Sequence, residues 1–62
     1  MRKEILIEKI KKIAGYREKR ILARLVKIEK IDNYDGFGAR FYDDKGNYFE
    51  VAEIDGELLI VG

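Results

Sequence analysis

The fold is decided by residues 37–61, FGARFYDDKGNYFEVAEIDGELLIV. Two turn signals interrupt a pattern of alternating apolar residues, which is typical of strands. Residues 43–47, DDKGN, predict a type I turn with a G1 bulge in which Gly46 takes the left-handed conformation. The pair Asp55-Gly56 predicts a two-residue type I′ turn. These two turns indicate three consecutive antiparallel strands.

The turns also predict which residues share a face of this meander. Closing the first hairpin on Asp43 and Asn47 gives the cross-strand pairs Tyr42–Tyr48, Phe41–Phe49, Arg40–Glu50 and Ala39–Val51. One face, which we call the inner face, then carries Phe37, Ala39, Phe41, Phe49, Val51, Leu58 and Ile60. The opposite, outer face carries Gly38, Arg40, Tyr42, Tyr48, Glu50, Ala52, Leu59 and Val61. We expect helices to cover the inner face.

Before the meander, apolar residues recur with the spacing of a helix. The apolar face of a first helix consists of Leu6, Ile10, Ile13 and Ala14, with charged residues elsewhere on the helical wheel. Gly15 follows at the position where a left-handed C-terminal cap belongs. The sequence therefore predicts that the first helix ends at Gly15.

A second helical pattern begins at Arg17. Its apolar side consists of Ile21, Leu22, Leu25, Val26 and Ile28. However, Glu29 interrupts this side, and the alternation of Val26 and Ile28 also suits a strand. A long strand over residues 20–31 is therefore the alternative to a second helix.

Together these elements predict an α+β fold of one domain, residues 1–62, with two N-terminal helices packed on a three-stranded antiparallel meander. The alternative is one helix followed by a small β-barrel of four or five strands. Charge divides the chain in a similar way, because residues 1–30 carry a net charge of +7 and residues 31–62 a net charge of −6. We expect a basic helical half, residues 1–31, and an acidic meander, residues 37–61, within the same domain.

Seven residue types are absent from the chain: Ser, Thr, Gln, His, Pro, Cys and Trp. Their absence excludes imidazole bases, thiolate or hydroxyl nucleophiles and the usual zinc ligands. We therefore expect a protein that is not an enzyme and has no cofactor. The chain also has neither the run of about 18 apolar residues of a membrane span nor a signal peptide. We expect a soluble protein, cytoplasmic or recombinant, without a membrane partner.

The restricted alphabet also bears on the origin of the chain. Proteins of hyperthermophiles are rich in Lys, Glu and Ile and poor in Gln and Cys, which does not account for the loss of Pro, Ser and Thr. Design or deliberate simplification accounts for it better, since idealised sequences combine strong helix formers with Asp-Gly turns. We therefore expect a thermostable, non-enzymatic scaffold of designed or reduced-alphabet origin, without an evolved ligand. A natural hyperthermophile protein is the alternative origin.

The alternative function is a small nucleic-acid-binding module that uses the basic helical half. Its candidate contacts with phosphate are Arg17, Lys19, Arg20, Arg24 and Lys27, most of which would follow one side of a second helix. The structural interpretation is a solvated helix face, or a set of cations that the acidic meander of the same molecule balances. We favour the structural interpretation.

Two other groups of residues have both a functional and a structural explanation. Tyr42, Tyr48 and Arg40 are able to stack nucleic-acid bases, but cross-strand aromatic pairs also stabilise hairpins. The apolar part of the same outer face suits a homo-oligomer, in which the chain is its own partner. The carboxylates Asp32, Asp35, Asp43, Asp44, Asp55 and Glu57 stand at turn positions, where Asp accepts backbone hydrogen bonds. We therefore expect no metal site.

Overall fold

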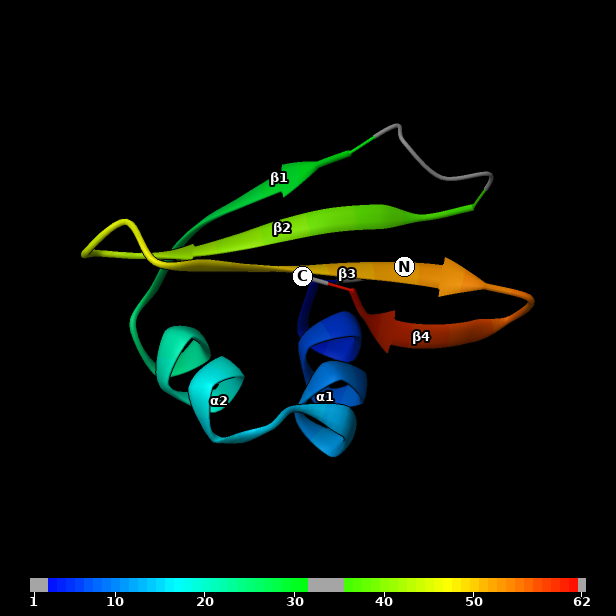
Figure 1. Ribbon diagram of the computed structural model, residues 1–62, viewed down its shortest axis with the longest axis horizontal. Coiled ribbons are helices and arrows are strands. Elements are labelled where there is room, and N and C mark those ends of the chain that lie inside the picture. The colour runs from blue at the N-terminus through cyan, green and yellow to red at the C-terminus, as the bar shows by residue number, and fades with distance from the viewer. Residues whose placement is uncertain (1–2, 32–35, 62) are drawn as a thin grey trace.

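The structure is a computed structural model that describes residues 3–31 and 36–61. In chain order the elements are α1 (Lys3–Ile13), α2 (Tyr16–Ala23), β1 (Leu25–Lys30), β2 (Gly38–Asp43), β3 (Tyr48–Ile54) and β4 (Glu57–Ile60). The strands form one antiparallel sheet in the order β1-β2-β3-β4, and both helices lie against one face of it (Figure 1). The expected α+β class is confirmed.

The sheet has one strand more than the predicted three-stranded meander. Helix α2 ends at Ala23, and residues 25–30 pair with β2 as the edge strand β1. This pairing places Ile28 opposite Phe41 and so covers one end of the core. The two interpretations of residues 20–31 were each correct for one part, because the segment is helical up to Ala23 and extended from Leu25. The alternative of one helix with a barrel is wrong, since two helices are present and the described sheet is open.

Both hairpins have the predicted register. Tyr42 lies opposite Tyr48, and the second hairpin continues the ladder as expected. Gly46 has a φ of +83°, the left-handed conformation that the turn requires. Asp55 and Gly56 have φ values of 52° and 81°, and two consecutive positive values define the type I′ turn. The local turn chemistry therefore positions the whole meander.

The hydrophobic core lies between the helices and the inner face of the sheet. Phe41 and Phe49 are fully buried, and their rings stack with centroids 5.2 Å apart. Ile10 of α1 and Val51 of β3 are buried with them. The other members of the cluster are Leu6, Ile21 and Ala39, with Ile7, Leu22, Leu25, Ile28, Phe37, Leu58 and Ile60 packed around them. Every apolar residue predicted for the inner face belongs to this core.

The junction between α1 and α2 differs from the predicted C-terminal cap. Gly15 has φ −82° and ψ −173°, an extended conformation that makes it the N-cap of α2. Its N–H donates to Glu18 Oε1 at 2.8 Å, and its carbonyl accepts from the Lys19 N–H at 3.0 Å. A Cβ atom at Gly15 would lie 2.8 Å from the same Glu18 oxygen, so glycine leaves room for this cap. Ile13, expected on the buried face, is 44% exposed because α1 ends there.

Candidate functional site

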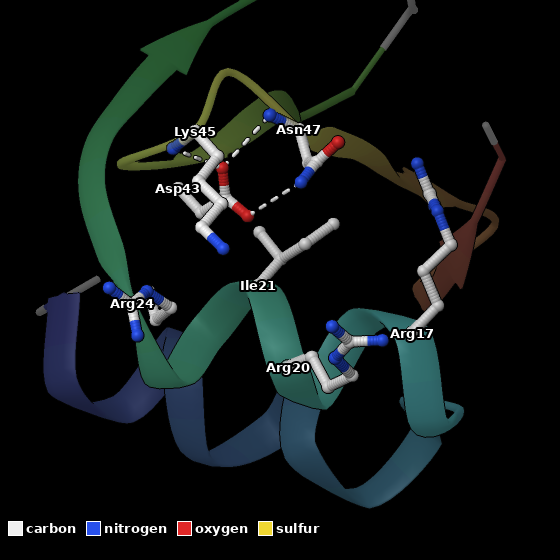
Figure 2. A pocket seen from close by; sticks show the side chains of 7 residues that line it. All are labelled: Arg17, Arg20, Ile21, Arg24, Asp43, Lys45 and Asn47. Atoms are coloured by element: carbon white, nitrogen blue, oxygen red, sulfur yellow. Dashed lines mark hydrogen bonds between the residues drawn. The ribbon is translucent and has the colours of Figure 1, made fainter.

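The described residues form a cationic pocket of about 260 Å³ between α2 and the β2–β3 hairpin. We call it the hairpin pocket. Its lining residues are Arg17, Arg20, Ile21, Arg24, Asp43, Lys45 and Asn47 (Figure 2). The arginines come from one side of the helix because residues three and four apart lie on the same helical face. The pocket therefore combines three of the five cations predicted to contact phosphate with a concave surface.

The first arginine contact in the hairpin pocket ties the end of α2 to the turn. Arg24 Nε donates to Asp44 Oδ1 and Oδ2 at 2.9 and 3.1 Å, and Arg24 Nη2 donates to Oδ2 at 2.8 Å. Such two-pronged geometry is the strong form of an arginine–carboxylate pair. The hydrogen bond and the charge of Asp44 raise the pKa of the Arg24 guanidinium. The same hydrogen bond and the positive charge of Arg24 lower the pKa of the Asp44 carboxyl.

A second arginine ties the beginning of α2 to the same hairpin. Arg17 Nη2 donates to the backbone carbonyl of Tyr48 at 2.6 Å. Arg17 Nη1 also lies 3.5 Å from Glu18 Oε2 on its own helix. Because Tyr48 is the first residue of β3, Arg17 and Arg24 hold the two ends of α2 on the two sides of one turn.

Asp43, at the base of the hairpin pocket, is only 7% exposed. Its Oδ1 accepts from the N–H groups of Lys45 and Asn47 at 2.8 and 2.9 Å, and its Oδ2 accepts from Asn47 Nδ2 at 3.1 Å (Figure 2). Burial alone would raise the pKa of this carboxyl, but the three hydrogen bonds together outweigh it and lower the pKa. The geometry therefore agrees with a structural role of Asp43 in the turn, since Lys45 and Asn47 of the same turn donate these hydrogen bonds to its carboxylate.

Two cations of the hairpin pocket, Arg20 and Lys45, have no acidic partner among the described residues. Arg20 lies 5.9 Å from the centroid of the Tyr16 ring. Neither Arg20 nor Lys45 forms an ion pair with any residue that the structure describes. Lys45 was not among the predicted contacts, and no linear signal could find it, because the turn reaches the helix only through tertiary packing.

The remaining two predicted contacts lie away from the hairpin pocket. Lys19 lies on another side of α2 and lines a separate groove. Lys27 belongs to β1 and lies on the outer face, with Nζ 5.3 Å from the centroid of the Tyr42 ring and 3.8 Å from Glu29 Oε2. The helical spacing does not extend to Lys27 because α2 ends at Ala23. The five predicted residues therefore do not form one continuous surface.

The aromatic pair on the outer face is part of a polar network. Arg40 donates to Glu50 Oε1 through Nη2 and Nε at 2.9 and 3.2 Å, and to Tyr42 Oη through Nη1 at 3.3 Å. The hydrogen bond to Tyr42, followed by that to Glu50, raises the pKa of Arg40. Arg40 also lies 4.9 Å from the centroid of the Tyr48 ring, and Tyr42 Oη donates to Glu29 Oε1 at 2.9 Å. Glu29 was not predicted here, because this contact depends on β1.

The described residues contain neither a cluster of metal-ligating side chains nor a helix that could span a membrane. No three of their carboxylates gather closely enough to hold a metal ion, and Asp32 and Asp35 lie outside the described ranges. None of the helices seen in residues 3–31 and 36–61 has the length and apolarity needed to cross a membrane. No protein-family model, curated protein or solved structure matches the chain.

Proposed function

We propose that this chain is a non-enzymatic, thermostable scaffold in which the basic residues of α2 dock the helix on the chain's own sheet. The observation that supports this proposal is the two-pronged pairing of Arg24 with Asp44. The hydrogen bond from Arg17 to the Tyr48 carbonyl acts at the other end of the same helix. Both arginines thus have partners within the chain, as expected if the basic residues serve the structure of the protein itself.

The shifted titratable groups also support a structural role. Burial opposes the lowered pKa of Asp43, which comes from hydrogen bonds within its turn, while Arg24 lowers the pKa of Asp44. The raised pKa of Arg40 accompanies hydrogen bonds to Tyr42 and Glu50 across the sheet. A catalytic group instead has a pKa shifted toward its working pH. Here each shift favours the charged form of a group that already has a structural partner.

We also propose that the restricted alphabet reflects design or deliberate simplification. Turn residues, strand alternation and the buried inner face agree with one another, and such agreement across levels is the aim of idealised sequences. Gly46 and the Asp55-Gly56 pair take the backbone conformations for which such sequences select them. This agreement supports the proposed thermostability as well.

Thermal unfolding followed by circular dichroism tests the scaffold proposal. We expect a single cooperative transition above about 60 °C, beyond the middle of the mesophile range. Arg24→Gln should lower the melting temperature at low salt, and added salt should reduce the difference by screening the ion pair. Lys19→Gln, on another side of the same helix, is the matched control and should have a smaller effect. A broad transition below that temperature, or equal effects of both variants, would contradict the proposal.

The second candidate function is nucleic-acid binding through the hairpin pocket. It is favoured by Arg20 and Lys45, which line the pocket without an ion pair in the described part of the chain. Titration of fluorescently labelled DNA and RNA at roughly 150 mM salt separates the candidates, since phosphate contacts weaken steeply with salt. Binding that the double variant Arg20→Gln/Lys45→Gln abolishes, and that Lys19→Gln retains, would replace the scaffold proposal. We expect no measurable binding.

A further inference from the structure

The two edge strands of the sheet differ in their protection against pairing with another chain. Strand β1 has a bulge between Leu25 and Lys27 and carries further charges at Glu29 and Lys30. Bulges and charged side chains are the usual means by which edge strands avoid pairing. Strand β4 pairs regularly with β3 and has only Glu57, its first residue, as a charge. Of the two edges, β4 is therefore the one open to pairing.

The ladder determines which backbone groups β4 directs away from the sheet. The Val61 N–H donates to the Glu50 carbonyl at 2.9 Å, so residue 61 faces β3. Backbone groups in an antiparallel ladder alternate with a period of two residues. The N–H and C=O groups of Leu58 and Ile60 consequently point toward the free edge. A second strand can pair with these two residues without disturbing the existing sheet.

An apolar groove of about 460 Å³ lies beside this edge. Its lining includes Ile13 of α1 and Leu58 and Leu59 of β4. The Leu59 side chain, on the outer face, is 41% exposed. Charges of both signs border the groove: Lys9, Lys12, Glu53 and Glu57. The edge thus offers apolar surface and opposite charges next to the outward backbone groups.

We infer that β4 pairs antiparallel with β4 of a second copy of the chain about a twofold axis. In the register that hydrogen-bonds the outward-pointing N–H and C=O groups, Leu58 lies opposite Ile60 of the second copy. Leu59 then lies beside Leu59 of the second copy at the axis, where cross-strand neighbours are in contact. Glu57 lies opposite Val61 of the second copy, so the two Glu57 carboxylates stay apart. One continuous sheet runs through both copies.

The observations favour this symmetric arrangement over other occupants. A head-to-tail assembly would join β4 to β1 of the next copy and would form a ring or an open filament, but the bulge and charges of β1 oppose it. A twofold contact uses β4 twice and closes on itself. A chain of this size, which buries only about 60% of its unfolded surface, gains further burial by association.

Light scattering after size-exclusion chromatography of the full chain tests the inference. We expect twice the mass of the single chain at micromolar concentration. Leu59→Lys places like charges at the axis and should halve the observed mass. Val26→Lys likewise introduces a lysine, but on the opposite edge strand β1, at a residue that is 65% exposed. This variant should leave the mass unchanged. A single-chain mass for the unaltered protein, dissociation by Val26→Lys, or open-ended assemblies would overturn the inference.

Amide hydrogen exchange provides a second readout that does not depend on a variant. In the dimer the Leu58 and Ile60 amides become hydrogen-bonded, so we expect their protection to rise with protein concentration. A dimer formed through the outer face alone would also be sensitive to Leu59→Lys, but would leave these two amides exchanging rapidly. Rapid exchange at every concentration would therefore overturn the β4 pairing even if a dimer were present. The inference is independent of the scaffold proposal, since Arg24→Gln should not alter either readout.

Discussion

The β2–β3 and β3–β4 hairpins have equally clear turns but different tertiary support. The β2–β3 hairpin contains the stacked, fully buried Phe41 and Phe49, and α2 contacts it through Arg17 and Arg24. The β3–β4 hairpin carries exposed apolar residues on its outer face, including Leu59. The turn sequence determines the register of each hairpin, and we expect the contribution of each hairpin to stability to follow its packing.

The largest expected effect comes from truncating the stacked pair. Phe41→Ala removes a fully buried ring and leaves a cavity, and should cost about 3–5 kcal/mol of unfolding free energy. Leu59→Ala in the second hairpin, where the side chain is partly exposed, should cost about 1 kcal/mol. Denaturant unfolding of both variants, at a concentration where they have the same oligomeric state, measures the difference. Similar costs would mean that the two hairpins contribute equally.

An intermediate effect is expected from the first turn. Gly46→Val forces a β-branched residue into positive φ and should cost on the order of 1 kcal/mol or more. A Cβ atom at Gly46 would meet no heavy atom within 4 Å, so the cost is conformational and not steric. Lys45→Ala, one residue earlier, should change the unfolding free energy little. Equal tolerance of both changes in denaturant unfolding would contradict the turn geometry and with it the register.

The smallest effect is a pH dependence that arises in the β2–β3 hairpin. Asp43 and Asp44 have a lower pKa in the folded chain than in the unfolded chain, so acid protonates the unfolded chain first. Their contribution to stability is complete above an unfolded pKa of about 3.9 and is lost as the pH falls through the folded pKa. Asp43→Asn should therefore flatten the fall in melting temperature between neutral and acidic pH.

Asp55→Asn in the second turn is the control for this pH dependence. Asparagine tolerates the positive φ of that position, and the Asp55 carboxylate accepts no hydrogen bond among the described residues. The variant should keep the acid sensitivity of the unaltered chain. An equal loss of sensitivity in both variants would show that net charge, and not the turn hydrogen bonds, governs the acid response.

Much of the sheet was predictable because its signals are local. Gly46 and Asp55-Gly56 set the turns, and the period of two along the strands then assigned every inner-face residue of the meander correctly. The candidate site was less predictable. The hairpin pocket brings Arg17, Arg20 and Arg24 together as predicted, but not Lys27. Their partners are distant in sequence: Tyr48 in β3 is 31 residues from Arg17, and Asp44 in the turn is 20 residues from Arg24.

The sequence by itself determined the α+β class, the two turns, the register of the meander and its buried face, because neighbouring residues encode backbone conformation and alternation. The tertiary structure decided where α2 ends, since residues 25–30 suit either element alone and become a strand by pairing with the free edge of β2. It also decided where the basic residues lie, separating Lys27 from Arg24 and bringing Asp44 to the helix. The physical reason is that hydrogen bonds and ion pairs between distant segments depend on packing, which no local pattern contains.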